Sequence, residues 1–346
     1  MTTGRAKTEN LAAPISIGGV IVDPPLILGP MAGTTNRVHR LLCRRGGAGL
    51  VCSEMVSINA IVQGNERTHE MLATFEDEHP VSIQLFGSDP EIMRDAVPVV
   101  VEAGADIIDI NMGCSVQKIR RNGAGVALMG KPDLAEKLTA AAVEASDVPV
   151  TVKIRAGLTL YDDGYVEYAR RMQDAGVAAV AVHWRAASQA FGGTPGWQPI
   201  ERVARALDVP VIGNGDVTQP EEAPLLMRHT GCDAVMIARA AWGCPWIFRR
   251  AASALRGERV PPDLGVEARM ATALLHAQML ALESDERMAL HQMRAHIHHY
   301  VKGLPSARYF RREANRLETL RGLHELVTRY MEGLRAGERP DGSEAR

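Results

Sequence analysis

The sequence has few cysteines, few aromatic residues and no excess of either charge. Its five cysteines are scattered over 346 residues without a C-x-x-C pair, which excludes a disulfide framework and a zinc knuckle. The 39 Lys and Arg residues nearly balance the 41 Asp and Glu residues, so the net charge indicates no class of partner. No run approaches the ~20 apolar residues of a membrane span. Residues 1–10 lack the apolar core of a signal peptide. We therefore predict a reduced, cytoplasmic protein without a membrane segment or a bound metal.

A repeated pattern dominates residues 26–237. Short apolar runs recur there, and each is followed by Gly or polar residues and then by a helical segment. Continuous apolar runs predict strands that are buried on both faces, as in a parallel sheet. Eight such units predict an α/β fold of the (β/α)8 TIM-barrel type. The alternative, a doubly wound open sheet, would more often show a G-x-G-x-x-G turn after its first strand, and none is present. The eight predicted strands are Leu26–Leu28, Gly49–Cys52, Val81–Phe86, Ile107–Ile110, Val150–Ile154, Ala179–His183, Val209–Ile212 and Ala234–Ile237.

The chain outside these units divides into shorter pieces. Ile15–Val22 predicts a hairpin that turns at Gly18-Gly19 and closes the floor of the barrel. The strand pattern ends after Phe248, and Pro261-Pro262 indicates a linker. The segment that follows is helix-forming, with a break at Gly303–Pro305. The predicted organisation is an N-terminal segment (1–13), the barrel (14–255), a small all-helical C-terminal domain (262–335) and a flexible tail (336–346).

The helical domain departs from the balanced charge of the whole chain. Residues 287–322 contain eight Lys and Arg residues but only two acidic ones, Glu313 and Glu318. A small substrate needs no such surface, so the excess argues for a polyanionic partner.

Active sites of barrels form at the carboxyl ends of the strands. Nearly every predicted strand delivers a polar or reactive group to that end, which stability alone does not require. These groups are Pro30-Met31-Ala32, Ser53-Glu54, Gln84, Asn111 to Cys114, Lys153 with Arg155, His183 with Arg185, Asn214 to Asp216, and Ala238-Arg239.

A phosphate site is the first function that these residues suggest. Gly213–Asp216 follows the seventh strand and Arg239 the eighth, where barrels often bind phosphate. Glycines let backbone N–H groups approach an anion, and the start of a short helix adds partial positive charge. A plain tight turn is the alternative, and the position on the last two strands favours phosphate.

Three reactive side chains have more than one interpretation. Lys153 ends the fifth strand, and it is either a Schiff-base nucleophile or a fixed cation beside an anionic cofactor. His183 is either a neutral core residue or part of the site. Cys114 lies before a basic, Gly-rich loop, from which a thiol can reach over a substrate and donate a proton. Cys43, Cys52 and Cys232 are instead expected to be buried apolar residues.

At this ring of residues the chain resembles the tRNA-dihydrouridine synthase family, most closely its bacterial B-like branch. The resemblance extends from about Ile15 to Met331, and its Asn-x-Gly-Cys and Lys-Ile-Arg combination is specific. The segments that carry it are Gly29–Gly33, Gln84–Gly87, Ile108–Cys114, Val152–Gly157, Ile212–Asp216, Ala238–Ala241 and Pro245–Phe248.

The resemblance implies an enzyme with non-covalent FMN that reduces uridine in tRNA to 5,6-dihydrouridine, with NADPH as electron donor. Cys114 is then expected to protonate uracil C5 while flavin N5 delivers hydride to C6, and Lys153 to stabilise the reduced flavin. Asn111 and Arg185 are expected to bind the uracil, and Arg311 and Arg312 of the helical domain to bind the RNA. The expected cofactor-binding residues are Pro30, Met31, Ala32, Gln84, Lys153, His183, Asn214, Gly215, Asp216, Ala238 and Arg239.

The chain departs from the family pattern at three places. Ser115 stands where Pro usually follows the cysteine. His183-Trp-Arg-Ala-Ala187 replaces His-Gly-Arg-Thr-Arg, and Arg294-Ala-His296 replaces Arg-Lys-His. The reactive groups are retained, whereas a threonine and an arginine expected near the RNA are missing.

Two other functions are weighed against this one. A small-molecule FMN oxidoreductase similar to dihydroorotate dehydrogenase would share the phosphate site but not the basic helical domain. A non-catalytic RNA-binding protein would need no Cys114 or Lys153. We therefore expect a monomeric enzyme whose partners are tRNA and NADPH.

Overall fold

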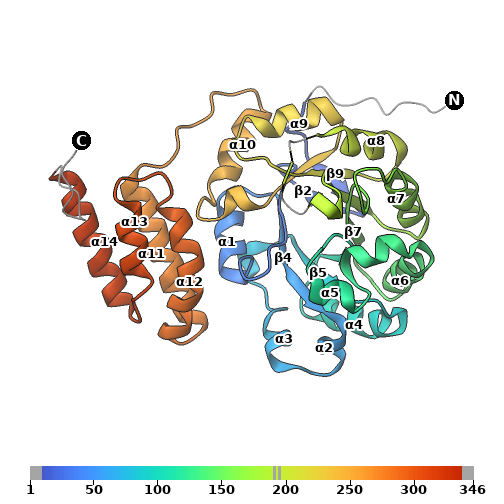
Figure 1. Ribbon diagram of the computed structural model, residues 1–346, viewed down its shortest axis with the longest axis horizontal. Coiled ribbons are helices and arrows are strands. Elements are labelled where there is room, and N and C mark those ends of the chain that lie inside the picture. Colours follow the sequence, from blue (N-terminus) through green and yellow to red (C-terminus); the bar gives the residue numbers. More distant parts are fainter. Residues whose placement is uncertain (1–9, 190–191, 194–195, 337–346) are drawn as a thin grey trace. The chain divides into compact units, whose positions relative to one another are not determined.

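A computed structural model describes residues 10–189, 192–193 and 196–336 (Figure 1). The chain divides into two compact units. The first contains residues 1–239 and 246–260, and the second contains residues 240–245 and 261–346. The predicted N-terminal segment and tail lie mostly outside the described residues.

The first unit is a closed barrel of eight parallel strands, in the order β10-β3-β4-β5-β6-β7-β8-β9. The prediction of a (β/α)8 barrel is confirmed, and each predicted strand overlaps one of the observed strands. The main differences are that β4 continues to Ser57, and that β9 begins at Val211 and continues to Asn214. The strands are β3 (Leu26–Leu28), β4 (Leu50–Ser57), β5 (Val81–Phe86), β6 (Ile107–Asn111), β7 (Val150–Arg155), β8 (Ala179–His183), β9 (Val211–Asn214) and β10 (Ala234–Ile237).

Helices surround the barrel in the connections between strands (Figure 1). Local signals fix where several of them begin. Asn36 caps α1 by accepting from the backbone N–H of His39, and Asp89 caps α4 in front of Pro90. The α-helices are α1 (Arg37–Arg45), α2 (Ile58–Val62), α3 (Glu66–Glu70), α4 (Pro90–Glu102), α5 (Gln117–Arg121), α6 (Pro132–Glu144), α7 (Tyr165–Asp174), α8 (Gln198–Ala206), α9 (Glu222–Thr230) and α10 (Ile247–Leu255). Short 3-10 helices are η1 (Glu76–Glu78), η2 (Gly125–Gly130), η3 (Ala187–Gln189) and η4 (Arg239–Ala241).

A hairpin of β1 (Ile15–Ile17) and β2 (Val20–Val22) packs against the interior of the barrel, as predicted. The turn uses positive φ angles of 55° at Gly18 and 98° at Gly19. A Cβ atom on Gly18 would lie 2.6 Å from the side chain of Pro149, so only glycine fits there. The hairpin side chains Ile17 and Val22 share one buried cluster with Ile27, Leu50, Cys52, Ile107, Ala179, Ala181, Ile212, Ala234 and Met236.

This cluster determines which side chains line the upper part of the barrel. Residues two apart on a strand point to the same face. Because Ile107 lies in the interior cluster, Asp109 and Asn111 of the same strand also face inward. The same alternation leads from Ala179 and Ala181 to His183. The interior is therefore apolar at the hairpin end and polar at the carboxyl end.

The second unit contains four α-helices in the described part of the chain, and they follow an irregular segment around Pro261-Pro262. The predicted break at Gly303–Pro305 is observed, and a further break separates the last two helices. The turn 240–245 belongs to this unit because the ring of Trp242 stacks on that of His299, with centroids 4.2 Å apart. The helices are α11 (Val266–Glu283), α12 (Glu286–Tyr300), α13 (Ala307–Ala314) and α14 (Leu320–Arg335). No helix in the described part of the chain is long and apolar enough to cross a membrane.

Candidate active site

Strand register brings the predicted site residues together at the carboxyl end of the barrel. Asn111 of β6 lies opposite Lys153 of β7. His183 of β8 lies between Arg155 of β7 and Asn214 of β9. Residues far apart in the sequence thus form one continuous ring, as expected from the strand ends.

A buried hydrogen-bond network links three of the strands inside this ring. The amide Nε2 of Gln84 donates to Oδ2 of Asp109 over 2.6 Å, and the hydroxyl of Thr151 donates to Oδ1 over 2.7 Å. The amide Nδ2 of Asn111 donates to Oε1 of Gln84 over 2.7 Å. Because the Asp109 carboxylate can only accept, it fixes which way the amide of Gln84 points and, through Gln84, that of Asn111.

The same network holds the backbone of the predicted catalytic cysteine. Oδ1 of Asn111 accepts from the backbone N–H of Gly113 over 3.2 Å and from that of Cys114 over 2.9 Å. Arg155 Nε donates to the carbonyl of Gly113 over 2.8 Å. The thiol of Cys114 is half-buried. Cys114 therefore has a defined backbone position at the mouth of the barrel.

The segment after Cys114 is more ordered than the basic, Gly-rich loop that we expected there. It contains the short helices α5 and η2, since six of its residues form a 3-10 turn starting at Gly125. The N–H of Val126 donates to the carbonyl of Cys114 over 3.0 Å. A Cβ atom on Gly125 would lie 2.7 Å from that carbonyl oxygen, so glycine permits this close approach.

Lys153 lies opposite Asn111 of this network in the strand register. Burial and the neighbouring charge of Arg155 lower the pKa of Lys153 to about 8, whereas the Asp109 carboxylate acts in the opposite direction. Burial also raises the pKa of Asp109 above its ordinary value. The charge of Lys153 therefore changes near neutral pH. Shifted pKa values of this kind are common among residues of functional sites.

His183 lies among positive charges. Burial, followed by the charges of Lys153 and Arg155, lowers the pKa of His183 to about 2. Its imidazole is therefore neutral at ordinary pH, with one nitrogen to donate and one to accept. The cations that surround it give this side of the barrel mouth a positive potential, which favours an anionic ligand.

Asp216 connects the two arginines predicted to bind the base and the phosphate. Its Oδ2 accepts from Arg185 Nη2 over 2.5 Å, and its Oδ1 accepts from Arg239 Nη2 over 2.7 Å. Asp216 itself has a φ of 54°, which is unusual for a residue other than glycine. Its carboxylate thus holds the two arginine side chains, while a direct role of Asp216 in cofactor binding stays a prediction.

The residues present fit a phosphorylated, acceptor-rich cofactor. Nδ1 of His183 and Nη1 of Arg185 are buried nitrogens without a hydrogen-bond partner among the described residues. Gly215 has a φ of 137°, which brings the backbone of residues 214–216 into a conformation that other residues rarely adopt. Buried donors without acceptors are costly, so a ligand with several oxygen atoms would satisfy them.

The predicted Pro30-Met31-Ala32 segment follows β3 and is held by hydrogen bonds to the residues that come after it in the chain. The Thr35 hydroxyl lies 3.0 Å from the Met31 backbone N–H, which donates to it. A buried ion pair supports this turn: Arg40 forms two hydrogen bonds with Glu78, of 2.9 and 3.0 Å, and its Nη1 donates to the carbonyl of Thr35. Ala238 is the residue that joins β10 to η4.

The sequence interpretation missed Asp109, and it placed Arg155 at the end of its strand without giving it a role. Asp109 stands two positions before Asn111 in an otherwise apolar strand, so the alternation of the strand predicts that it faces inward. Arg155 stands two positions after Lys153, and its contact with Gly113 could not be read without the register of β6 and β7.

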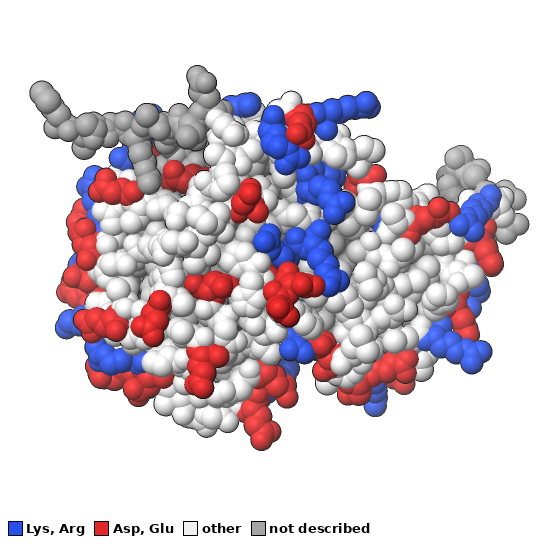
Figure 2. All heavy atoms as spheres, turned by 180° about the vertical axis from the view of Figure 1, so that it is seen from behind, with Lys and Arg blue, Asp and Glu red and all other residues white. Residues whose placement is uncertain are grey.

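Arg311 and Arg312 lie on α13 of the helical unit, apart from the ring residues in the sequence. Much of the basic surface there is ion-paired, with Arg312 bound to Glu313 over 2.9 Å and Arg321 to Glu325 over 3.0 Å. On the face in Figure 2, acidic side chains lie next to some of the basic ones, whereas other Lys and Arg side chains gather in a band near the middle of the view. Part of the positive charge of the helical segment is therefore balanced by neighbouring acidic side chains.

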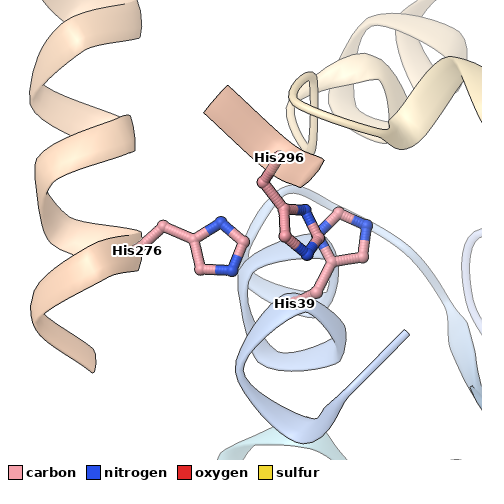
Figure 3. Close-up of side chains that lie close together, drawn as sticks. All are labelled: His39, His276 and His296. Atoms are coloured by element: carbon pink, nitrogen blue, oxygen red, sulfur yellow. The ribbon is translucent and has the colours of Figure 1, made fainter. Parts of the chain in front are cut away.

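The histidines of the helical unit are in part buried. The ring of His296 lies 4.4 Å from that of His276, centroid to centroid (Figure 3). Nδ1 of His276 lies 3.2 Å from the hydroxyl of Tyr300. His296, in the Arg294–His296 segment, therefore belongs to the interior of the described structure rather than to an exposed binding face.

Comparisons with known proteins identify one family. The sequence model described as dihydrouridine synthase matches residues 27–332. The tRNA-dihydrouridine synthase B of Xanthomonas campestris is 38% identical over 94% of this chain and 98% of its own length. That of Pseudomonas aeruginosa is 39% identical over 88% of this chain and 92% of its own length.

Solved structures show a similar fold at low sequence identity. The old yellow enzyme homologue from Zymomonas mobilis matches with a TM-score of 0.55 at 16% identity, over 70% of this chain and 92% of its own. Histamine dehydrogenase from Rhizobium sp. 4-9 also has a TM-score of 0.55, at 13% identity over 71% of this chain and 48% of its own. Both support the barrel architecture.

Proposed function

The chain belongs to the dihydrouridine synthase family, and from this we propose that it reduces uridines of tRNA to 5,6-dihydrouridine, with FMN as non-covalent cofactor and NADPH as electron donor. The observation that carries this proposal is the extent of the match, which runs from residue 27 to residue 332 and so covers both the barrel and most of the helical unit. A resemblance limited to the barrel would support only a flavin enzyme.

The ring residues have the properties that FMN needs. Arg239, with the backbone of Asn214–Asp216, would hold the phosphate, and His183 would contact the ribityl chain. Pro30, Met31, Ala32 and Gln84 would line the flavin ring, with Lys153 beside it. The pKa of about 8 lets Lys153 be charged near neutral pH, where it attracts an anion. When bound, FMN supplies the hydride that is transferred to C6 of the uracil.

Cys114 supplies the second hydrogen in this proposal. Addition of hydride at C6 leaves negative charge on C5 and O4 of the uracil, and an acid placed on the open side of the pocket can protonate C5. The hydrogen bonds from the backbone N–H groups of Gly113 and Cys114 to Asn111 Oδ1 hold the backbone of Cys114 at the barrel mouth. Asn111 and Arg185 would bind the base. Arg155, through Gly113, would keep the cysteine in place.

The target uridine is stacked inside folded RNA, so it has to be extruded into the barrel, at a cost of a few kcal/mol. Contacts of the helical unit with RNA phosphates, including those of Arg311 and Arg312, would offset this cost. We also propose that the enzyme acts as a monomer with one FMN per chain. A small-molecule oxidoreductase and a non-catalytic RNA-binding protein are the alternatives, and neither explains the combination of Cys114 with the family match over both units.

Incubation of the purified protein with FMN, NADPH and an unmodified tRNA transcript tests the proposal. We expect digested RNA to contain dihydrouridine, detected by mass spectrometry as uridine with two added hydrogens. A reaction without NADPH, with the flavin in its oxidised form, is the control. If the protein neither binds FMN nor forms dihydrouridine, the proposed activity is excluded. If it binds FMN but reduces only free uracil or uridine and not the RNA, the small-molecule alternative is favoured.

A further inference from the structure

Trp184 is a buried residue at the barrel mouth that no function described so far uses. It stands between His183 and Arg185, and only 4% of its surface is exposed. Its indole Nε1 is a buried donor that has no hydrogen-bond partner among the residues that the structure describes. An indole N–H usually has an acceptor when it is buried, so this one indicates a missing partner.

The indole lies against the predicted phosphate loop. A Cβ atom on Gly215 would lie 2.1 Å from Cδ1 of Trp184 and 2.5 Å from its Nε1, so the N–H edge of the ring occupies the space that a side chain at 215 would need. The backbone N–H of Trp184 donates to the carbonyl of Asn214 over 3.2 Å. Both contacts place the unpartnered nitrogen beside residues 214–216.

Neighbouring groups hold the ring in this orientation and add positive charge. The guanidinium of Arg185 lies over the indole, 4.2 Å from the ring centroid. The same arginine is fixed by Asp216, and Arg239 is bound to the other oxygen of that carboxylate. The indole N–H, the buried Nη1 of Arg185 and the exposed part of Arg239 therefore surround one loop. An anion at this loop would accept from all three.

We propose that Trp184 is a cofactor-binding residue whose indole N–H donates a hydrogen bond to the phosphate of FMN. This inference rests on the proposed function, because it takes FMN as the ligand of the loop. An RNA phosphate is the other anion that could reach the barrel mouth. The contact of the indole with Gly215 argues for FMN, because it turns the N–H edge toward the predicted phosphate loop rather than toward an exposed surface. Neither the family pattern, which has glycine at this position, nor the comparisons assign a role to this tryptophan.

FMN affinity of the apoprotein tests the proposal. Trp184→Phe keeps an aromatic ring against Gly215 but removes the donor. Because a hydrogen bond to a charged acceptor is worth more than a neutral one, we expect the Kd for FMN to rise roughly ten- to a hundredfold, measured by the quenching of flavin fluorescence. The affinity for riboflavin, which has no phosphate, should change much less.

Trp197→Phe is the matched control. The indole Nε1 of Trp197 is also buried without a partner among the described residues, but its ring packs edge-on against His229, with centroids 5.8 Å apart. The Trp197→Phe variant should therefore bind FMN with the same Kd as the wild type. If Trp184→Phe binds FMN as the wild type does, or if it loses affinity equally for riboflavin and FMN, the proposed contact with the phosphate is wrong. The same holds if the variant loses RNA affinity while its FMN affinity is unchanged.

A measurement on the wild-type protein keeps the test valid if Trp184→Phe does not fold. The four tryptophans give four indole N–H signals in a nitrogen-15 spectrum, and Phe variants of Trp197, Trp242 and Trp246 assign the remaining signal to Trp184. Addition of FMN should move that signal downfield, and riboflavin should move it less. An unmoved signal in FMN-saturated protein would overturn the proposal. If the wild-type apoprotein does not bind FMN at all, the proposed function fails first.

Discussion

Gln84 and Asp109 are joined by a hydrogen bond of 2.6 Å inside the barrel, from Nε2 of the amide to Oδ2 of the carboxylate. Through this bond Asp109 acts on two residues at the barrel mouth, Asn111 and Cys114. Gln84 accepts a hydrogen bond from Asn111, and Asn111 accepts one from the backbone N–H of Cys114. The same carboxylate also raises the pKa of Lys153. Asp109 is therefore a positioning residue for both the amides and the lysine of the site.

The first prediction concerns the pH dependence of FMN binding. Protonated Lys153 attracts the anionic cofactor, and the bound cofactor raises the pKa of the lysine. At a pH above the pKa of Lys153 in the free protein, which is about 8, FMN binding is therefore coupled to the uptake of a proton by Lys153. The affinity should fall as pH rises from about 8 to about 9, by up to about tenfold per pH unit. Titration of apoprotein with FMN measures this, and Lys153→Met should bind more weakly without the decline. Wild-type affinity that is constant over this range would contradict the assignment of Lys153.

The second prediction uses Asp109→Asn. The asparagine oxygen can still accept from Gln84, but the negative charge that raises the pKa of Lys153 is lost. The decline of FMN affinity should therefore begin at a lower pH than in the wild type. Asp95→Asn, at an exposed position of α4, is the control and should leave the pH profile unchanged. A shift of the Asp109→Asn profile to higher pH would show that the sign of this interaction is wrong.

The third prediction concerns proton donation by Cys114. Cys114→Ala should bind FMN and RNA and accept electrons from NADPH as the wild type does. Oxidation of its reduced flavin by RNA in a single turnover should be about 10²–10⁴ times slower, since general acid catalysis contributes this much. Cys43→Ala removes a fully buried thiol of α1 and should affect stability rather than this rate. Wild-type oxidation in Cys114→Ala would mean that another group donates the proton.

RNA binding by the helical unit provides the fourth prediction. Replacement of both Arg311 and Arg312 by Ala should weaken RNA binding irrespective of sequence. It should reduce the slope of log affinity against log salt by up to about two units, since each phosphate contact releases nearly one counterion. Arg94→Ala with Arg170→Ala, on exposed faces of α4 and α7, is the control. An unchanged slope in the first double variant would mean that this basic surface does not contact RNA.

The fifth prediction concerns the stability of the barrel. Glu78→Gln leaves the guanidinium of Arg40 buried without its ionic partner, because the exposed fractions of these side chains are 0% and 2%. The free energy of unfolding should fall by about 3–5 kcal/mol, measured by urea denaturation. Asp77→Asn breaks an exposed ion pair with Arg45 and should cost at most about 1 kcal/mol. Equal losses in both variants would show that burial of the Arg40–Glu78 pair is unimportant.

The sequence predicted the barrel well because the signal for each strand is local. A run such as Ala234–Ile237 is apolar without alternation, and it lies on a strand as predicted. The ring of site residues followed from the same signal, since the polar residue after an apolar run lies at the carboxyl end. The turn at Gly18-Gly19 was equally local.

Contacts between side chains of different strands could not be predicted from the sequence. The bond from Gln84 to Asp109 depends on the pairing of β5 with β6, and the bond from Arg155 to Gly113 depends on that of β6 with β7. The ion pairs of Asp216 with Arg185 and Arg239 likewise join three different connections. The helices α5 and η2 were missed because the glycines around them predict loops when their tertiary contacts are unknown.

The closure of the barrel also sets an order of events during synthesis. Leu26 pairs with Val235, and Leu28 with Ile237, so the first and last strands of the barrel are neighbours. A ribosome adds about 5–20 residues per second, so roughly ten to forty seconds pass between the emergence of these two strands. During this time β3 has an open edge that can pair with another nascent chain. Ribosome-bound chains that end before Ala234 should therefore depend on chaperones and be unable to retain FMN, whatever side chains they already carry.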